Sequence, residues 1–98
     1  MKYHNYFVYI TTNPKKTVLY VGLTNDLYTR LQQHKDNQGD KNTFAGKYCC
    51  YNLIHWERFN QIEHAIEREK EIKKWRREKK ENLINQLNPE WKFLNDEI

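Results

Sequence analysis

VLYVGLTNDLYTRLQQH, from Val18 to His34, is the stretch that decides the fold of this chain. Residues 18–21 are β-branched, aliphatic or aromatic, which favours an extended strand, and Gly22 can take the backbone geometry that ends it. Thr24 or Asn25 can then cap a helix, because both side chains accept hydrogen bonds from free backbone N–H groups. The stretch therefore predicts a strand, a tight turn and a helix.

The predicted helix, from Asn25 to about Lys35, carries polar side chains where a core is expected. Leu27, Leu31 and position 34 recur at the i, i+4, i+7 spacing of a buried helical stripe, yet position 34 is a histidine. Arg30 borders the same stripe, one turn before His34. A purely structural helix has little use for these two side chains, so both are candidate functional residues.

Two further segments have the composition of strands. Tyr3 to Thr11 and Tyr51 to Phe59 are rich in aromatic and β-branched residues. The first should pair with Thr17 to Val21 as an antiparallel hairpin, which places Tyr9 and Tyr20 on neighbouring strands. With helices to cover its apolar face, this predicts an α+β fold, a small three-stranded antiparallel sheet flanked by helices.

From Gln61 onward the hydrophobic period becomes helical. The apolar side of this helix is formed by Ile62, Ala65, Ile66 and Ile72. Glu69 falls in the middle of that apolar stripe, where an unpaired charge is costly. We therefore expect Glu69 to pair with a cation such as an arginine, to coordinate a metal, or to face an opening. A further helix is predicted from Asn82 to Leu87, ended by residues 88–89.

Length and composition limit the classes of protein. The 98 residues fit one domain, 1–98, and hydrophobic residues make up 38% of them, which is typical of a globular protein. No segment is apolar enough for a signal peptide or a membrane span, which predicts a cytoplasmic protein with no membrane association. Cys49 and Cys50 are adjacent, which suits neither a disulfide nor a zinc site.

The charge of the chain is basic. There are 17 Lys and Arg against 13 Asp and Glu, giving a net charge of +4, which favours polyanionic partners. Seven cations are concentrated in one short segment: Lys70, Lys73, Lys74, Arg76, Arg77, Lys79 and Lys80. A solvated helix surface with i, i+4 ion pairs and a nucleic-acid interface both account for this pattern.

The order of the candidate residues resembles that of the GIY-YIG nuclease family. Phe7-Val8-Tyr9 stands at the first of its two tripeptides and Tyr20-Val21-Gly22 at the second. Arg30 follows ten residues after Tyr20, His34 comes one turn later, and Glu69 lies on a downstream helix. The resemblance covers nearly the whole chain, looks closest to the small single-domain bacterial members, and implies the same three-stranded fold.

This resemblance implies a metal-dependent endonuclease that hydrolyses DNA phosphodiester bonds. Tyr20 would be the general base or proton relay for the attacking water, with Tyr9 orienting water or phosphate. Since a free phenol has a pKa of about 10, that role requires nearby positive charge. Arg30 would hold the scissile phosphate, and His34 would bond the phosphate or assist proton transfer. Glu69 would bind one Mg²⁺ or Mn²⁺.

The chain also departs from the family pattern. Phe7 and Val8 replace the first Gly and Ile, and Leu23 stands where some members carry a lysine. The resemblance implies DNA as partner and no small-molecule cofactor; the sequence does not define the oligomeric state, and a monomer is the default. The alternative is a non-catalytic nucleic-acid-binding module that retains the fold, and a third interpretation is a domain that binds an acidic protein. Glu69 in an apolar stripe favours the nuclease, because binding alone does not require it.

Overall fold

The sheet has the predicted three antiparallel strands. The structure, a computed structural model, describes residues 5–36 and 47–98. Strands β1 (Tyr6–Thr12), β2 (Leu19–Thr24) and β3 (Asn52–Phe59) lie in the order β2-β1-β3, so β1 is central. The predicted fold class is confirmed. Tyr3 and His4, which the first strand was expected to include, lie outside the described residues.

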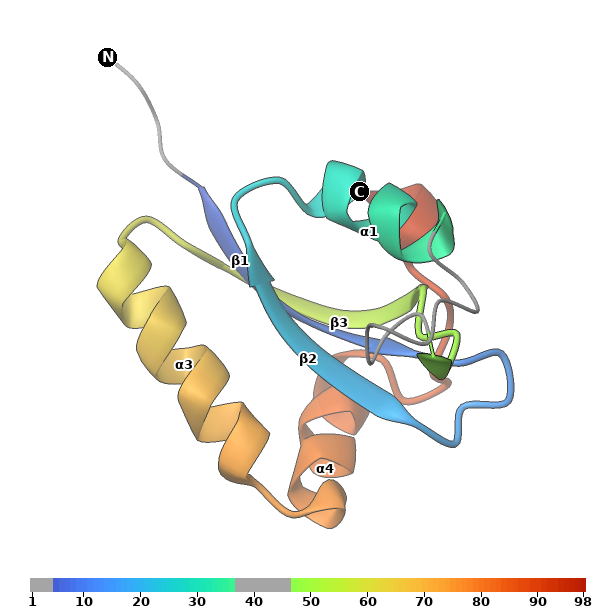
Figure 1. The fold of residues 1–98 in the computed structure, drawn as a ribbon. Helices are drawn as coiled ribbons and strands as arrows, with labels where there is room; N and C mark the ends of the chain where they lie inside the picture. The colour runs from blue at the N-terminus through green and yellow to red at the C-terminus, as the bar shows by residue number, and fades with distance from the viewer. Residues whose placement is uncertain (1–4, 37–46) are drawn as a thin grey trace.

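Helices cover both faces of the sheet. Helix α1 (Leu27–Asp36) lies on one side, and α3 (Ile62–Lys74) and α4 (Arg77–Leu87) lie on the other (Figure 1). A short 3₁₀ turn, η1 (Asn95–Glu97), follows near the C-terminus beside α1. No helix within the described ranges is both long and apolar enough to cross a membrane.

The alternation of side chains along the strands divides the core into two layers. Val8 and Ile10 of β1 point towards α3 and α4, in a cluster with Val21, Ile54, Ala65, Ile72 and Ile84. Tyr9, between them in sequence, points the other way and packs with Leu27, Leu31 and Leu53 on the α1 side. The predicted buried stripe of α1 is thereby confirmed, because Leu27, Leu31 and His34 are all buried.

The β1–β2 hairpin is closed by a side chain. The Asn13 carboxamide oxygen accepts hydrogen bonds from the backbone N–H groups of Thr17 and Val18, at 2.8 and 2.9 Å. This satisfies donors that the turn would otherwise leave unpaired. Strand β2 begins at Leu19 and continues to Thr24, so Gly22 lies inside the strand and the prediction that it ends the strand is wrong.

The basic segment is divided between two helices. Helix α3 ends at Lys74, Trp75 and Arg76 have extended backbones, and α4 begins at Arg77, five residues before the predicted start at Asn82. On α3 the predicted apolar side is only partly correct, since Ala65 and Ile72 are buried but Ile66 is 36% exposed.

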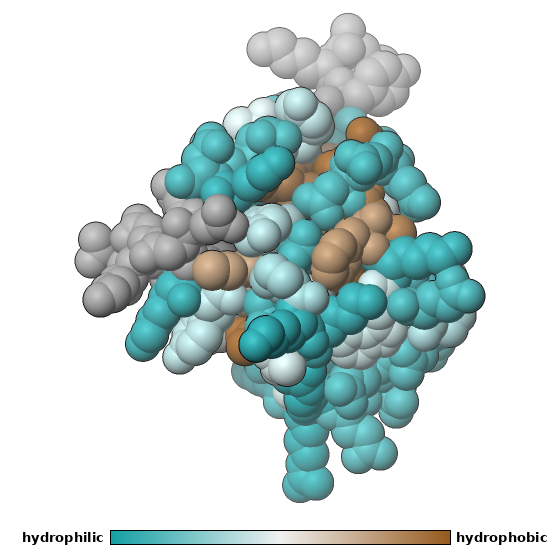
Figure 2. All heavy atoms as spheres, turned by 90° about the vertical axis from the view of Figure 1, so that its right-hand side faces the viewer, coloured by the Kyte–Doolittle hydropathy of each residue, from teal (hydrophilic) through white to brown (hydrophobic). Residues whose placement is uncertain are grey.

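The segment after α4 is fixed to the sheet through one buried amide. Asn88, which ends α4 as predicted, donates from Nδ2 to the carbonyls of Ile54 and Lys92, at 3.0 and 2.9 Å. Trp91 packs against the α3-side core, whereas Phe93 is 43% exposed. Seen from the side that carries the hairpin turn and α1, the surface is largely hydrophilic, with hydrophobic side chains gathered near its middle (Figure 2).

Candidate active site

A buried hydrogen bond between a strand and a helix forms the centre of the predicted site. The Tyr9 hydroxyl lies 2.9 Å from Nε2 of His34, and the two residues are 1% and 8% exposed. Burial raises the pKa of Tyr9 well above its usual value, so the phenol stays protonated. Burial and the Arg30 charge lower the pKa of His34, so the imidazole is neutral at neutral pH. In the tautomer with its proton on Nδ1, His34 accepts the hydrogen bond from Tyr9.

Tyr20 completes a cluster of three rings. Its ring centroid lies 6.2 Å from that of Tyr9 and 5.3 Å from that of His34, with the Tyr20 and His34 planes nearly perpendicular. The strand register explains this contact, since Tyr20 pairs with Thr11 and therefore lies diagonally across from Tyr9. Unlike Tyr9, Tyr20 is only half-buried. The prediction that the two tyrosines lie on paired strands is confirmed.

Gly22 makes room for the Tyr9 ring. The two residues are paired across β1 and β2, and a Cβ atom at position 22 would lie 2.4 Å from both Cζ and the hydroxyl oxygen of Tyr9. No carbon atom can occupy that space without displacing the phenol. Gly22 is therefore needed because it has no side chain, which leaves room for the Tyr9 ring to cross β2 towards His34.

Helix α1 brings Arg30 to the same cluster. Asp26 sets the start of the helix, because its carboxylate accepts hydrogen bonds from the backbone N–H and the hydroxyl of Thr29, at 3.1 and 2.8 Å. The predicted caps, Thr24 and Asn25, are therefore wrong; the Thr24 hydroxyl accepts a bond from the N–H of Asp26 instead. Arg30 is exposed; its positive charge adds to the effect of burial in lowering the pKa of His34 and offsets part of the rise in the pKa of Tyr9.

Glu69 comes from the opposite side of the sheet. Helix α3 packs on the outer strand β2, and the Glu69 carboxylate is close enough to raise the pKa of Tyr9. Its side chain is 19% exposed, and Nζ of Lys73 lies 3.7 Å from it. The expected cation is therefore present, but it is a lysine one turn along the same helix. At 3.7 Å the pair is loose and leaves carboxylate lone pairs available.

The Glu69 carboxylate could bind a divalent ion only in an open site, in which water and substrate supply most of the other ligands. Among residues 5–36 and 47–98, no group of three or more His, Cys, Asp or Glu side chains could hold a metal by itself. Mg²⁺, however, keeps several waters and is commonly bound through one or two carboxylates together with substrate phosphates. The half-buried Glu69, with its single loose partner, is compatible with that kind of site.

Two relevant features were not predicted from the sequence. The Thr11 hydroxyl, opposite Tyr20, is fully buried and has no hydrogen-bond partner in the described part of the chain. Leu23, at the position of the family lysine, packs on the α3-side core. Strand alternation could have placed both side chains, but the missing partner of Thr11 depends on tertiary packing.

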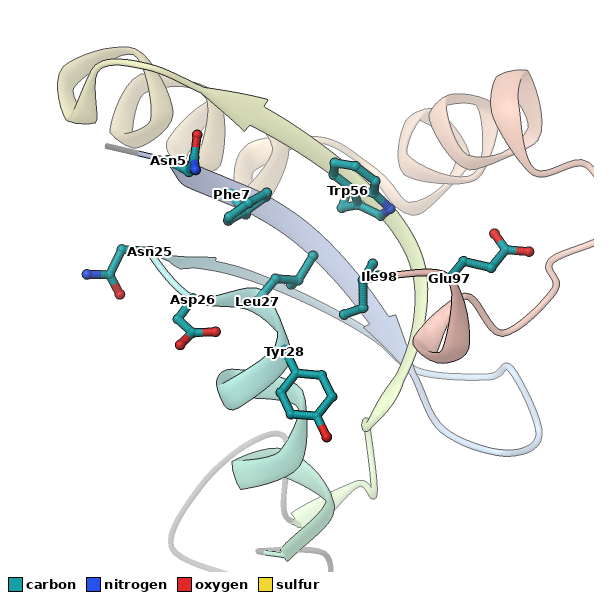
Figure 3. A pocket seen from close by; sticks show the side chains of 9 residues that line it. All are labelled: Asn5, Phe7, Asn25, Asp26, Leu27, Tyr28, Trp56, Glu97 and Ile98. Carbon is teal, nitrogen blue, oxygen red and sulfur yellow. The ribbon is translucent and has the colours of Figure 1, made fainter. Parts of the chain in front are cut away.

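A separate hollow of about 370 Å³ lies on the α1 side of the sheet, beyond the cluster (Figure 3). Phe7, Leu27, Tyr28 and Trp56 supply its apolar walls, and the Phe7 and Trp56 rings meet edge to face at 6.0 Å. None of the five predicted catalytic residues lines it.

Comparisons with known proteins find similar sequences. Residues 5–82 match the GIY-YIG catalytic domain. A UPF0213 protein from Natronomonas pharaonis is 36% identical over 80 residues, covering 82% of this chain and 91% of that protein. The UPF0213 protein YazA from Bacillus subtilis is 35% identical over 86 residues, covering 88% and 84%.

A solved structure is similar as well. The solution NMR structure of a UPF0213 protein from Bacillus halodurans aligns with a TM-score of 0.54 and 30% sequence identity, over 86% of each chain. Sequence similarity therefore extends to proteins from bacteria and archaea, and the fold is shared with a solved bacterial protein.

Proposed function

Because this chain belongs to the GIY-YIG family, we propose that it is a metal-dependent endonuclease that hydrolyses DNA phosphodiester bonds. The observation that carries the proposal is the convergence on one buried phenol. Tyr9 is bonded to His34, lies beside the Tyr20 ring, and has its pKa altered by the charges of both Arg30 and Glu69. These groups come from β1, β2, α1 and α3, and a purely structural core does not require them together.

The two tyrosines have different roles in this proposal. Burial keeps the Tyr9 phenol protonated, so Tyr9 positions His34 through their hydrogen bond and does not act as a base. Tyr20 is half-buried at the outer strand, which solvent and substrate can reach, and it takes the proton of the attacking water. Edge-to-face packing against the His34 ring at 5.3 Å holds the Tyr20 ring beside the other cluster residues.

Arg30 and His34 act on the phosphate. The planar guanidinium of Arg30 binds two phosphate oxygens and stabilises the charge that develops on them in the transition state. Arg30 is exposed, so its side chain can reach a bound strand of DNA. His34, held neutral by burial and by the Arg30 charge, hydrogen-bonds the phosphate or passes on a proton.

Glu69 would hold the divalent ion, Mg²⁺ or Mn²⁺. When bound, that ion supplies positive charge next to the phosphate oxygens. Glu69 contributes the negative ligand, and the Lys73 ammonium, 3.7 Å from its carboxylate, is loosely enough placed to give way to an ion. We place this activity in the cytoplasm and take the enzyme to be a monomer by default.

The test is cleavage of supercoiled, branched and single-stranded DNA by the purified protein with Mg²⁺ or Mn²⁺. Tyr20→Phe and Glu69→Ala should each abolish most of the cleavage while leaving the fold intact. Tyr28→Phe on α1 and Glu67→Ala on α3 are matched controls, because both residues are exposed and lie outside the cluster. These controls should cut like the wild type.

The outcome also decides between the nuclease and the binding module. A wild-type protein that binds DNA but cuts none of the substrates in either metal would favour a non-catalytic nucleic-acid-binding module. Cleavage that persists in Glu69→Ala would show that the carboxylate is wrongly assigned or that the activity comes from a contaminant.

A further inference from the structure

The basic segment is largely without internal ion pairs. Of its seven cations, only Lys73 and Arg77 form salt bridges with carboxylates of the described residues. The other five have no such partner there: Lys70, Lys74, Arg76, Lys79 and Lys80. A solvated helix surface with i, i+4 ion pairs therefore does not account for this segment. Its positive charge remains available to an external polyanion.

Three of these cations surround a hollow at the junction of α3 and α4, which we call the elbow. The hollow measures about 370 Å³ and is lined by Lys74, Trp75, Arg76, Glu78, Lys79 and Asn82. The lining carries three positive charges against the single negative charge of Glu78, so the hollow is net positive. In Figure 1 the elbow lies at the lower end of the molecule, and the corresponding end in Figure 2 is covered by hydrophilic side chains.

Trp75 holds the elbow in a defined shape. It is half-buried, packs against the α3-side core, and lies between the two helices. The Lys79 ammonium is 4.5 Å from the centre of its ring, and the Arg68 guanidinium is 5.1 Å from it. The ring thereby reduces the mobility of Lys79, so less conformational entropy is lost when the ammonium binds a ligand.

The elbow lies close to the proposed active site. Lys74 follows Glu69 by five residues on α3, an axial rise of about 8 Å. One DNA strand presents a phosphate about every 3.4 Å of duplex axis. Measured along the α3 axis, the elbow therefore begins within a few nucleotide spacings of Glu69, and Lys74 projects about 140° around the helix from it. Arg77, next to it, donates to the Thr17 carbonyl at 2.6 Å, which connects the start of α4 to the hairpin that leads into β2.

We propose that the elbow binds backbone phosphates of DNA on one side of the cleaved bond. The contacts are made by Lys74, Arg76 and Lys79 and do not depend on base sequence. This inference rests on the proposed function for the identity of its ligand. It goes beyond that function because it assigns substrate binding to a surface that contains none of the catalytic residues.

The experiment measures DNA binding without cleavage. A labelled DNA duplex is titrated in EDTA with the wild type, with Lys74→Gln/Lys79→Gln, and with Lys15→Gln/Lys92→Gln as a control of equal charge change. Lys15 and Lys92 are exposed and lie in the hairpin turn and near the C-terminus. Glutamine preserves the helix propensity of positions 74 and 79, and Lys15 and Lys92 are exposed outside the helices, so both proteins should fold.

Each lost phosphate contact should weaken binding about tenfold at roughly 50 mM salt and lower the slope of log K against log salt by about 1. The elbow variant, which loses two contacts, should therefore bind about a hundredfold more weakly, with a slope reduced by about 2, and the control should match the wild type. Equal affinity and slope in the two double variants would overturn the inference.

Two other outcomes separate this inference from the proposed function. Wild-type protein that shows the expected binding difference but cuts no DNA supports the elbow and removes the nuclease. The second outcome concerns a poly-glutamate peptide. If the peptide binds the wild type more tightly than DNA of equal charge does, and the elbow variant no longer binds it, the surface would be assigned to an acidic protein and the inference overturned.

Discussion

Gly22→Ala tests the contact on which the buried half of the site depends. The added Cβ would lie 2.4 Å from the end of the Tyr9 ring, so the phenol must move. The end of a side chain can often rotate away, but Tyr9 is 1% exposed and its hydroxyl is bonded to His34. The substitution therefore both overpacks the α1-side core and breaks a buried hydrogen bond.

The cost can be estimated from these two effects. Overpacking typically costs about 1–3 kcal/mol, and loss of the buried Tyr9–His34 bond adds about 1–2 kcal/mol. Replacing a glycine inside a strand returns about 0.5–1 kcal/mol through reduced backbone entropy. We expect a net loss of about 1–4.5 kcal/mol, which for a chain of this length lowers Tm by roughly 4–35 °C.

The assay is urea unfolding in a double-mutant cycle with Tyr9→Ala. If the clash is with the phenol, Gly22→Ala should cost little in the Tyr9→Ala background, and the coupling energy should approach the full single-mutant cost. A loss of stability that is the same in both backgrounds, or no loss in the wild type, would refute the reasoning.

Three more predictions follow from the charges at the site and at α3. Because the pKa of His34 is lowered in the folded state, the free energy of unfolding should decline as pH falls below about 6.5, by at most about 1.4 kcal/mol per pH unit. Denaturant titrations at pH 7 and 5 should show a smaller decline for His34→Gln. On β3, hydrogen bonds from His55 and Arg68 overcome the effect of burial and lower the pKa of Glu57 to about 2. The contribution of Glu57 to the stability of the fold is therefore complete above pH 4.5 and is lost as pH falls towards 2. Thermal unfolding at pH 5, 4 and 3 should show a weaker acid dependence for Glu57→Gln than for the wild type. Arg30→Lys should reduce single-turnover cleavage on the order of 10²-fold while changing stability by less than about 0.5 kcal/mol, and equal rates would exclude a bidentate role for this arginine.

The sheet and α1 could be predicted because each has a clear period. Strand residues such as Val8 and Ile10 are β-branched and bounded by polar turns, and Leu27, Leu31 and His34 recur at helical spacing. The exact cap could not be predicted, because residues 24–26 are all capping residue types. The choice of Asp26 depends on where the chain leaves β2.

The start of α4 was missed because its first turns have no hydrophobic stripe. Arg77–Leu87 opens with charged residues, and Ile84 is the only buried residue of the helix. Its position is set by packing of Ile84 in the α3-side core and by the Arg77 contact with the hairpin, both of which are tertiary. Local sequence contains neither.

The role of Gly22 could not be predicted from the sequence. A glycine after a strand-like run indicates a turn, since the backbone freedom of glycine is its best-known property. Here the relevant property is size, and it matters only because Tyr9 is the cross-strand partner. The order of Tyr9, Tyr20, Arg30, His34 and Glu69 indicated the candidates, but their roles remain predictions.

The central place of β1 divides the site into a rigid half and an adaptable half. The backbone around Tyr9 is hydrogen-bonded to strands on both sides, so its amides should be among the slowest in the protein to exchange with deuterium. The Arg30 side chain is exposed on α1 and the Glu69 carboxylate has a loose partner on α3, so both side chains can rotate while their helices stay packed on the sheet. Distortion of an incoming nucleic acid would therefore be accommodated by the guanidinium and the carboxylate, against a fixed pair of Tyr9 and His34 that serves as the reference point.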